Sequence, residues 1–180
     1  MRVPVQEPYD PKAVANYFLS KKNRHRLGRL TQMKLQKLVY FAHGYTLAVC
    51  NEPLINEHFE AWEYGPVVPT LYHEFKEFGA RPLPRQATDF DFETLEYTDT
   101  PAIATDEIPE SMRLVLEFVC DTYGRLSAGQ LSTLTHQEGS AWDQTVREYP
   151  RLKHVDIPNK LIKADFNKIL ARTKEGNNGR

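Results

Sequence analysis

The stretch LVYFAHGYTLAVC, residues 38–50, decides the fold, because its thirteen consecutive positions contain no Asp, Glu, Lys or Arg. Thr31 can cap a helix upstream of it, and apolar residues then follow at helical spacing: Leu35, Leu38, Val39, Ala42, Tyr45 and Val49. A second stripe beside the first contains Gln36, Tyr40, His43 and Leu47. We therefore predict a helix buried at the centre of the fold, with two exposed lysines near its start, Lys34 and Lys37.

This apolar run is too short to cross a membrane, because a spanning helix needs about 20 apolar residues. The N-terminal sequence MRVPVQEPYD lacks the apolar core of a secretory signal. Cys50 and Cys120 stand alone in apolar stretches, which is typical of buried free thiols in a reducing cytosol. We therefore expect a cytoplasmic protein that does not bind membranes.

Shorter elements are predicted on both sides of the central helix. Prolines at helix starts and apolar periodicity predict helices that begin near residues 11, 69, 109 and 158, and two more cover about 128–138 and 141–148. A short strand or hairpin is predicted over 53–67, with a turn at Tyr64-Gly65-Pro66. Residues 21–30 are interpreted as a basic connector, and residues 80–108 as a long loop with a short strand near 91–97.

Together these elements predict a mainly α fold with a small β element (α+β), built as a single compact domain of about six or seven helices around the buried central helix. The domain is predicted to cover residues 10–172. Residues 1–9 would be an N-terminal extension, and residues 173–180 a flexible tail.

Charge is distributed unevenly along the chain, although the formal net charge is only −1. Residues 11–51 contain eight Lys/Arg and no acidic residue, whereas residues 52–121 contain sixteen Asp/Glu and four Lys/Arg. Two interpretations stay open: the two parts can pair internally, or the basic part can face an acidic partner. The basic segment 21–37 could also contact nucleic acid, but a sequence pI of about 6.6 argues against a dedicated nucleic-acid-binding protein.

Motifs for catalysis or cofactor binding are missing from the sequence. It contains no HExxH, CxxC, P-loop, GxGxxG or GxSxG pattern. We therefore expect no cofactor, no bound metal and no catalytic residue.

Two histidines nevertheless need an interpretation. His43 lies within the buried stripe, where both ring nitrogens need partners, and we expect Glu60 or Glu63 to supply an acceptor. His136, with Glu138 and Trp142, is interpreted as a hydrogen-bonded network at a helix end. The alternative is a metal-dependent hydrolase that uses His43 and His136.

Several motifs occur in a characteristic order. Residues 33–43 (MKLQKLVYFAH) are followed by residues 61–69 (AWEYGPVVP), and later by Leu131 through His136, Ala141-Trp142 and Ile157-Pro158. This order resembles the Panacea domain, also called the SocA-like antitoxin family, of phage-associated proteins. The resemblance extends from about residue 10 to residue 170. It implies a cytosolic antitoxin that neutralises a toxin by direct protein–protein contact, without enzymatic activity. Some family members also act as adaptors that deliver the toxin to a cytosolic protease.

On this basis we expect the cognate toxin, encoded by the adjacent gene, to contact a groove between the central helix and residues 64–72. The predicted contacts are Lys34, Lys37, Tyr40, Tyr64 and Tyr72. A second set is predicted to hold the shape of the site rather than to bind: His43, Trp62, Gly65, Pro66, His136 and Trp142.

Overall fold

The computed structural model describes residues 7–104 and 106–177, and its central element is helix α3 (Gln32–Cys50). Thr31 caps this helix, because its Oγ1 accepts a hydrogen bond from the backbone N–H of Lys34 at 3.3 Å. Fifteen of the nineteen residues of α3 are buried. The predicted buried central helix is therefore confirmed.

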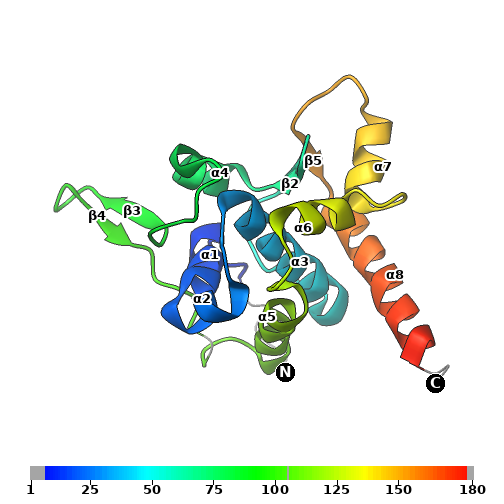
Figure 1. Cartoon of the computed structure of the whole chain (residues 1–180), viewed down its shortest axis with the longest axis horizontal. Coiled ribbons are helices and arrows are strands. Elements are labelled where there is room, and N and C mark those ends of the chain that lie inside the picture. Colours follow the sequence, from blue (N-terminus) through cyan, green and yellow to red (C-terminus); the bar gives the residue numbers. More distant parts are fainter. Residues whose placement is uncertain (1–6, 105, 178–180) are drawn as a thin grey trace.

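Seven further α-helices and one 3₁₀ turn complete the helical part that the structure describes. They are α1 (Pro11–Leu19), α2 (Lys21–Leu27), α4 (Pro69–Phe75), η1 (Lys76–Phe78), α5 (Glu110–Tyr123), α6 (Ala128–Thr135), α7 (Ala141–Glu148) and α8 (Asn159–Asn177). α8 and α5 make the most extensive contacts with α3, and α1, α4 and α6 also pack against it (Figure 1). The predicted mainly α, α+β domain is confirmed. The prediction of a basic connector over residues 21–30 is wrong in part, because residues 21–27 form the helix α2.

α8 approaches α3 closely at Gly44. The ring of Phe166 lies over Gly44, and a Cβ atom on that glycine would stand only 2.2 Å from the ring. Phe166 is 1% exposed and also packs edge-on against Tyr40 and Tyr45. Gly44 is therefore required for this helix contact.

A small antiparallel sheet with strand order β2-β1-β5 packs beside α3. Its strands are β1 (Phe59–Trp62), β2 (Gly65–Val67) and β5 (Val155–Ile157). β1 and β2 form a hairpin, one of the two alternatives predicted from the sequence, but its turn lies at Glu63-Tyr64 and not at Tyr64-Gly65-Pro66, because Gly65 and Pro66 belong to β2. β5 comes from the distant segment just before α8 and was not predicted.

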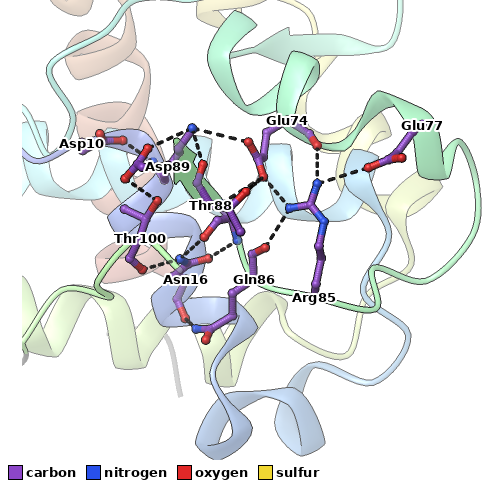
Figure 2. Close-up of polar contacts among 11 residues, drawn as sticks. Asp10, Asn16, Glu74, Glu77, Arg85, Gln86, Thr88, Asp89 and Thr100 are labelled. Atoms are coloured by element: carbon purple, nitrogen blue, oxygen red, sulfur yellow. Dashed lines mark hydrogen bonds and ion pairs between the residues drawn. The ribbon is translucent and has the colours of Figure 1, made fainter. Parts of the chain in front are cut away.

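The predicted long loop contains a second β element, the hairpin of β3 (Thr88–Asp91) and β4 (Glu96–Asp99). This hairpin projects from the body of the molecule at the left of Figure 1. The polar network at its base is shown in Figure 2. Within it, Asn16 of α1 donates hydrogen bonds to the carbonyls of Ala87 and Thr100 and accepts one from Ala87 N–H. α1 therefore holds both ends of the hairpin.

The chain ends differ in part from the prediction. α8 continues to Asn177, so residues 173–177 of the predicted tail are helical, and residues 178–180 lie outside the described part. Most of the predicted N-terminal extension, residues 1–6, also lies outside it. Tyr9 exchanges backbone hydrogen bonds with Leu54 and Asn56, at 2.9 and 3.0 Å. Among the described helices, none combines the length and the apolar character that a membrane span requires.

Candidate partner-binding groove

A groove of about 440 Å³ lies where the start of α3 meets the β1–β2 turn and α4. α3 contributes one wall through Gln32, Met33, Gln36 and Lys37. The opposite wall is largely aromatic and contains Trp62, Tyr64, Tyr72 and His154. This is the place predicted from the sequence, and the structure brings Tyr64 and Tyr72 together there.

Trp62 organises the aromatic wall. Its ring stacks on His154, with centroids 4.1 Å apart and planes at 9°, and it contacts Tyr72 at 4.6 Å. Its indole N–H donates to Glu60 Oε2 at 2.7 Å, which fixes the ring within the strand. Tyr64, in contrast, is 64% exposed at the tip of the turn. The wall therefore combines a fixed aromatic base with an exposed tyrosine.

Two side chains of the α3 wall bind the backbone of the opposite segment. Gln36 pairs with the backbone of Val68, donating to its carbonyl at 3.1 Å and accepting from its N–H at 2.9 Å. Lys37 donates from Nζ to the Pro66 carbonyl at 2.9 Å. Burial lowers the pKa of Lys37 to about 7, because the ammonium form loses its hydration there. These contacts attach the β1–β2 turn and the residues after it to the central helix.

The predicted exposure of the two lysines is wrong. Lys34 is 4% exposed and Lys37 is 1% exposed. Lys34 donates to the carbonyls of Leu27 and Gly124, so it joins the ends of α2 and α5. Helical periodicity could not show this, because the acceptors are carbonyls of other segments. Both lysines therefore stabilise the fold from inside and present no charge at the surface.

Tyr40 is likewise buried, at 2% exposure, and its ring packs edge-on against Phe59 and Phe166. Its hydroxyl group has no hydrogen-bond partner among the residues that the structure describes. Burial raises the pKa of this phenol. The predicted partner contact at Tyr40 is therefore not available on this surface, and the residue belongs to the core.

His43 is fully buried, as predicted, but its partners differ from those expected. Ile55 N–H donates to Nδ1 at 3.3 Å, so the proton of the neutral ring is on Nε2, which lies 2.9 Å from Asn159 Oδ1. Burial lowers the pKa of His43 to about 4. The expectation that Glu60 or Glu63 accepts from His43 was therefore wrong. Asn159 opens α8 and is 116 residues away in sequence, so local patterns gave no indication of it.

The residues around His136 hold the β1–β2 turn from the other side. Nδ1 of His136 lies 2.6 Å from the Ser132 carbonyl, and Nε2 lies 3.1 Å from the Glu63 carbonyl. The indole N–H of Trp142, whose ring packs on His136, donates to the Trp62 carbonyl at 2.8 Å. Glu138 instead faces Arg147, at 3.6 Å. His136 and Trp142 therefore form a helix-end network that contacts the backbone of the β1–β2 turn, and Glu138, which was expected in it, is not part of it.

Gly65 allows this turn to lie against α3 and α6. Its φ of +101° is unfavourable for any residue with a side chain, and a Cβ would stand 2.5 Å from Thr135 Oγ1 and 3.0 Å from Lys37 Nζ. Pro66 follows it and supplies the carbonyl that Lys37 binds. Gly65 and Pro66 therefore allow this close contact between β2, α3 and α6.

The alternative metal site built on His43 and His136 is not assembled in the described part of the chain. His43 and His136 bind different segments, and no three His, Cys, Asp or Glu side chains in residues 7–104 and 106–177 are grouped so that they could hold a metal ion. In the basic segment, Arg24 donates to the carbonyls of Leu19 and Leu83, and Arg26 pairs with Asp121. Much of the basic charge is therefore used internally, which favours the first interpretation of the charge pattern.

Comparisons with known proteins agree with the order of motifs. The model of the family described as "Antitoxin SocA-like, Panacea domain" matches residues 35–143, which include most of α3, the β1–β2 turn, α4 and the β3–β4 hairpin. The chain is similar to Antitoxin SocA of Caulobacter vibrioides (strain NA1000 / CB15N), with 36% identity over 134 residues that cover 74% of this chain and 69% of that protein. No solved structure was found that matches the chain.

Proposed function

We propose, because the chain belongs to the SocA-like antitoxin family with a Panacea domain, that it neutralises a cognate toxin by direct protein–protein binding at the groove. The resemblance predicted from the motifs is confirmed by both comparisons. Of the surfaces described, the geometry of the groove makes it the favoured binding site for the toxin.

The observation that carries this proposal is an exposed tyrosine on a rigid turn. Tyr64 is 64% exposed, while the backbone around it is held by Lys37, His136 and Trp142. Ser132 Oγ also donates to the Tyr64 carbonyl at 3.0 Å. Aromatic residues with few rotatable bonds are frequent anchors in protein interfaces, and a fixed backbone reduces the entropy lost on binding. Tyr64 and Tyr72 are thus the proposed toxin contacts, and the buried Lys37 holds the backbone beside Tyr64 through the Pro66 carbonyl.

Co-expression with the product of the adjacent gene tests this proposal. We expect the wild-type chain to restore growth and to co-purify with that toxin. Tyr64→Ala is expected to weaken affinity by at least tenfold without changing the melting temperature, because the side chain is largely in solvent. Tyr149→Ala is a matched control, since Tyr149 is 41% exposed at the end of α7 and is not among the residues that line the groove. Failure of the wild-type chain to protect cells and to bind the toxin would refute the proposal.

We further propose that neutralisation occurs in the cytoplasm and without enzymatic activity, so that one chain protects against a stoichiometric amount of toxin. A titration with purified proteins should then end at a fixed ratio, whereas an enzyme would inactivate an excess of toxin. Delivery of the toxin to a cytosolic protease rests on the family resemblance alone. The half-life of the toxin in cells with and without this chain tests it.

A further inference from the structure

The β3–β4 hairpin exposes an unusual amount of apolar surface. Four large side chains lie on its strands and tip, and their exposed fractions are 37% for Phe90, 83% for Phe92, 72% for Leu95 and 71% for Tyr97. Single exposed apolar residues are common on proteins, but a contiguous group usually marks an interaction surface.

The strand register separates this hairpin into two different faces. Phe90 lies directly opposite Tyr97, and because side chains alternate along a strand, both point to the same face. Phe92 in the turn extends this cluster, with its ring 5.0 Å from that of Phe90. The other face carries Asp89, which contacts Lys12 of α1 at 3.0 Å. Asp89 therefore attaches this side of the hairpin to the body of the protein, and the aromatic face is left in solvent.

The base of the hairpin is firmly attached. Besides the hydrogen bonds of Asn16, Glu74 of α4 accepts from Thr88 N–H at 3.0 Å and pairs with Arg85, which also pairs with Glu77 (Figure 2). An isolated two-stranded hairpin is marginally stable in water, so this network is needed to hold it in place. The aromatic face is thus presented in a defined position.

The tip contains a residue that turn chemistry does not favour. Leu95 has a φ of +57°, a conformation that Gly or Asn adopts at lower cost. Gly or Asn at this position would make the folded state more stable, and Leu95 also exposes apolar surface to solvent. Local rules are often broken where a residue is retained for function.

Charge defines the kind of surface that fits the hairpin. Residues 88–99 contain five acidic residues and no Lys or Arg. Lys12 pairs with Asp89, and Asp91 accepts hydrogen bonds from the backbone of the turn. In the described part of the chain, Glu93, Glu96 and Asp99 form no ion pair. A complementary surface would have an apolar recess bordered by Lys or Arg.

We propose that the aromatic face and tip of the β3–β4 hairpin form a second docking surface for the toxin, and that they enter an apolar recess with a basic border. This inference rests on the proposed function. α4 links the two surfaces, because Tyr72 lines the groove while Glu74 holds the base of the hairpin. One partner that covers α4 can therefore contact both.

Affinity measurements with the purified toxin from the adjacent gene test this inference. The double variant Phe92→Ser/Leu95→Asn is expected to weaken binding by at least tenfold and to keep the melting temperature. Its control is Leu114→Asn, which changes a leucine that is 50% exposed on α5.

The variant Glu93→Gln/Glu96→Gln is expected to slow association with the toxin and to make the association rate less dependent on salt. Asp106→Asn/Glu107→Gln removes two acidic residues outside the hairpin and serves as its control.

The outcomes separate the two proposals. If the wild-type chain does not bind the toxin, the proposed function is wrong and this inference falls with it. If Tyr64→Ala weakens binding but both hairpin variants bind like the wild type, only the docking role of the hairpin is refuted. A loss of self-association in Phe92→Ser/Leu95→Asn, with unchanged toxin affinity, would assign the surface to a second copy of this chain and would also refute it.

Discussion

Helix α3 and the β3–β4 hairpin use the same residue types in opposite ways. α3 contains Tyr40, Phe41 and Tyr45, all at 3% exposure or less. The hairpin contains Phe90, Phe92 and Tyr97, with exposed fractions between 37% and 83%. The difference lies in the neighbours: helices and strands pack around α3, whereas the three hairpin rings contact one another and no other ring in the described part of the chain.

This contrast separates stability from binding. Changes in α3 should lower the free energy of unfolding, because its buried rings are closely packed and a change in their volume leaves a cavity or a clash. Changes on the aromatic face of the hairpin should leave that free energy within about 0.5 kcal/mol and should act on partner affinity.

The largest effect on stability is expected from Gly44→Ala. The new Cβ would stand 2.2 Å from the buried ring of Phe166, so α8 must move away from α3. Overpacking of this kind costs about 3 kcal/mol. Denaturant unfolding followed by circular dichroism measures it. Gly129→Ala on α6 is the control, because its Cβ would meet only Ser127 Oγ at 4.0 Å, and we expect it to be neutral or to stabilise. Equal stability of the two variants would contradict the packing described at Gly44.

A slightly smaller effect is expected from acid acting on His43. Its pKa is lowered from 6.5 to about 4 by burial, so between these values the unfolded chain binds a proton that the folded chain does not. Stability should therefore fall as the pH decreases from 7 to 4, by about 2.5 kcal/mol from this residue. The measurement is the unfolding free energy of the wild type and of His43→Gln across this range. The two curves should converge toward low pH, and parallel curves would show that the ring titrates normally.

A still smaller effect is expected from Lys37, in the opposite pH range. Its pKa is lowered from 10.5 to about 7, so above pH 7 the folded chain loses a proton that the unfolded chain keeps. Stability should therefore rise between pH 7 and pH 9, by about 2 kcal/mol from this residue. Lys37→Met should lack this rise, and Lys153→Met, a change at an exposed lysine, should retain it. If Lys37→Met kept the full rise, the amine would be charged and hydrated in the folded protein.

Local sequence patterns were sufficient for several of these features. The uncharged run 38–50 predicted the buried helix, and the residues around Gly65-Pro66 predicted the first hairpin and the groove beside it. The hydrogen-bond partners of individual side chains were harder to predict from the sequence. Lys34 and Lys37 were expected in solvent because a lysine in a helix normally is, and their carbonyl acceptors belong to other segments.

Periodicity and turn chemistry act between residues close together in the chain, so they established the elements, the fold class and the order of motifs in this protein. Tertiary packing decided which groups became buried and what satisfied them: Asn159 for His43, the Pro66 carbonyl for Lys37, and Asn16 for the base of the β3–β4 hairpin. Such pairings form between distant segments only when the whole chain has folded, because a buried polar group takes the nearest available partner in space, however far away it lies in the sequence.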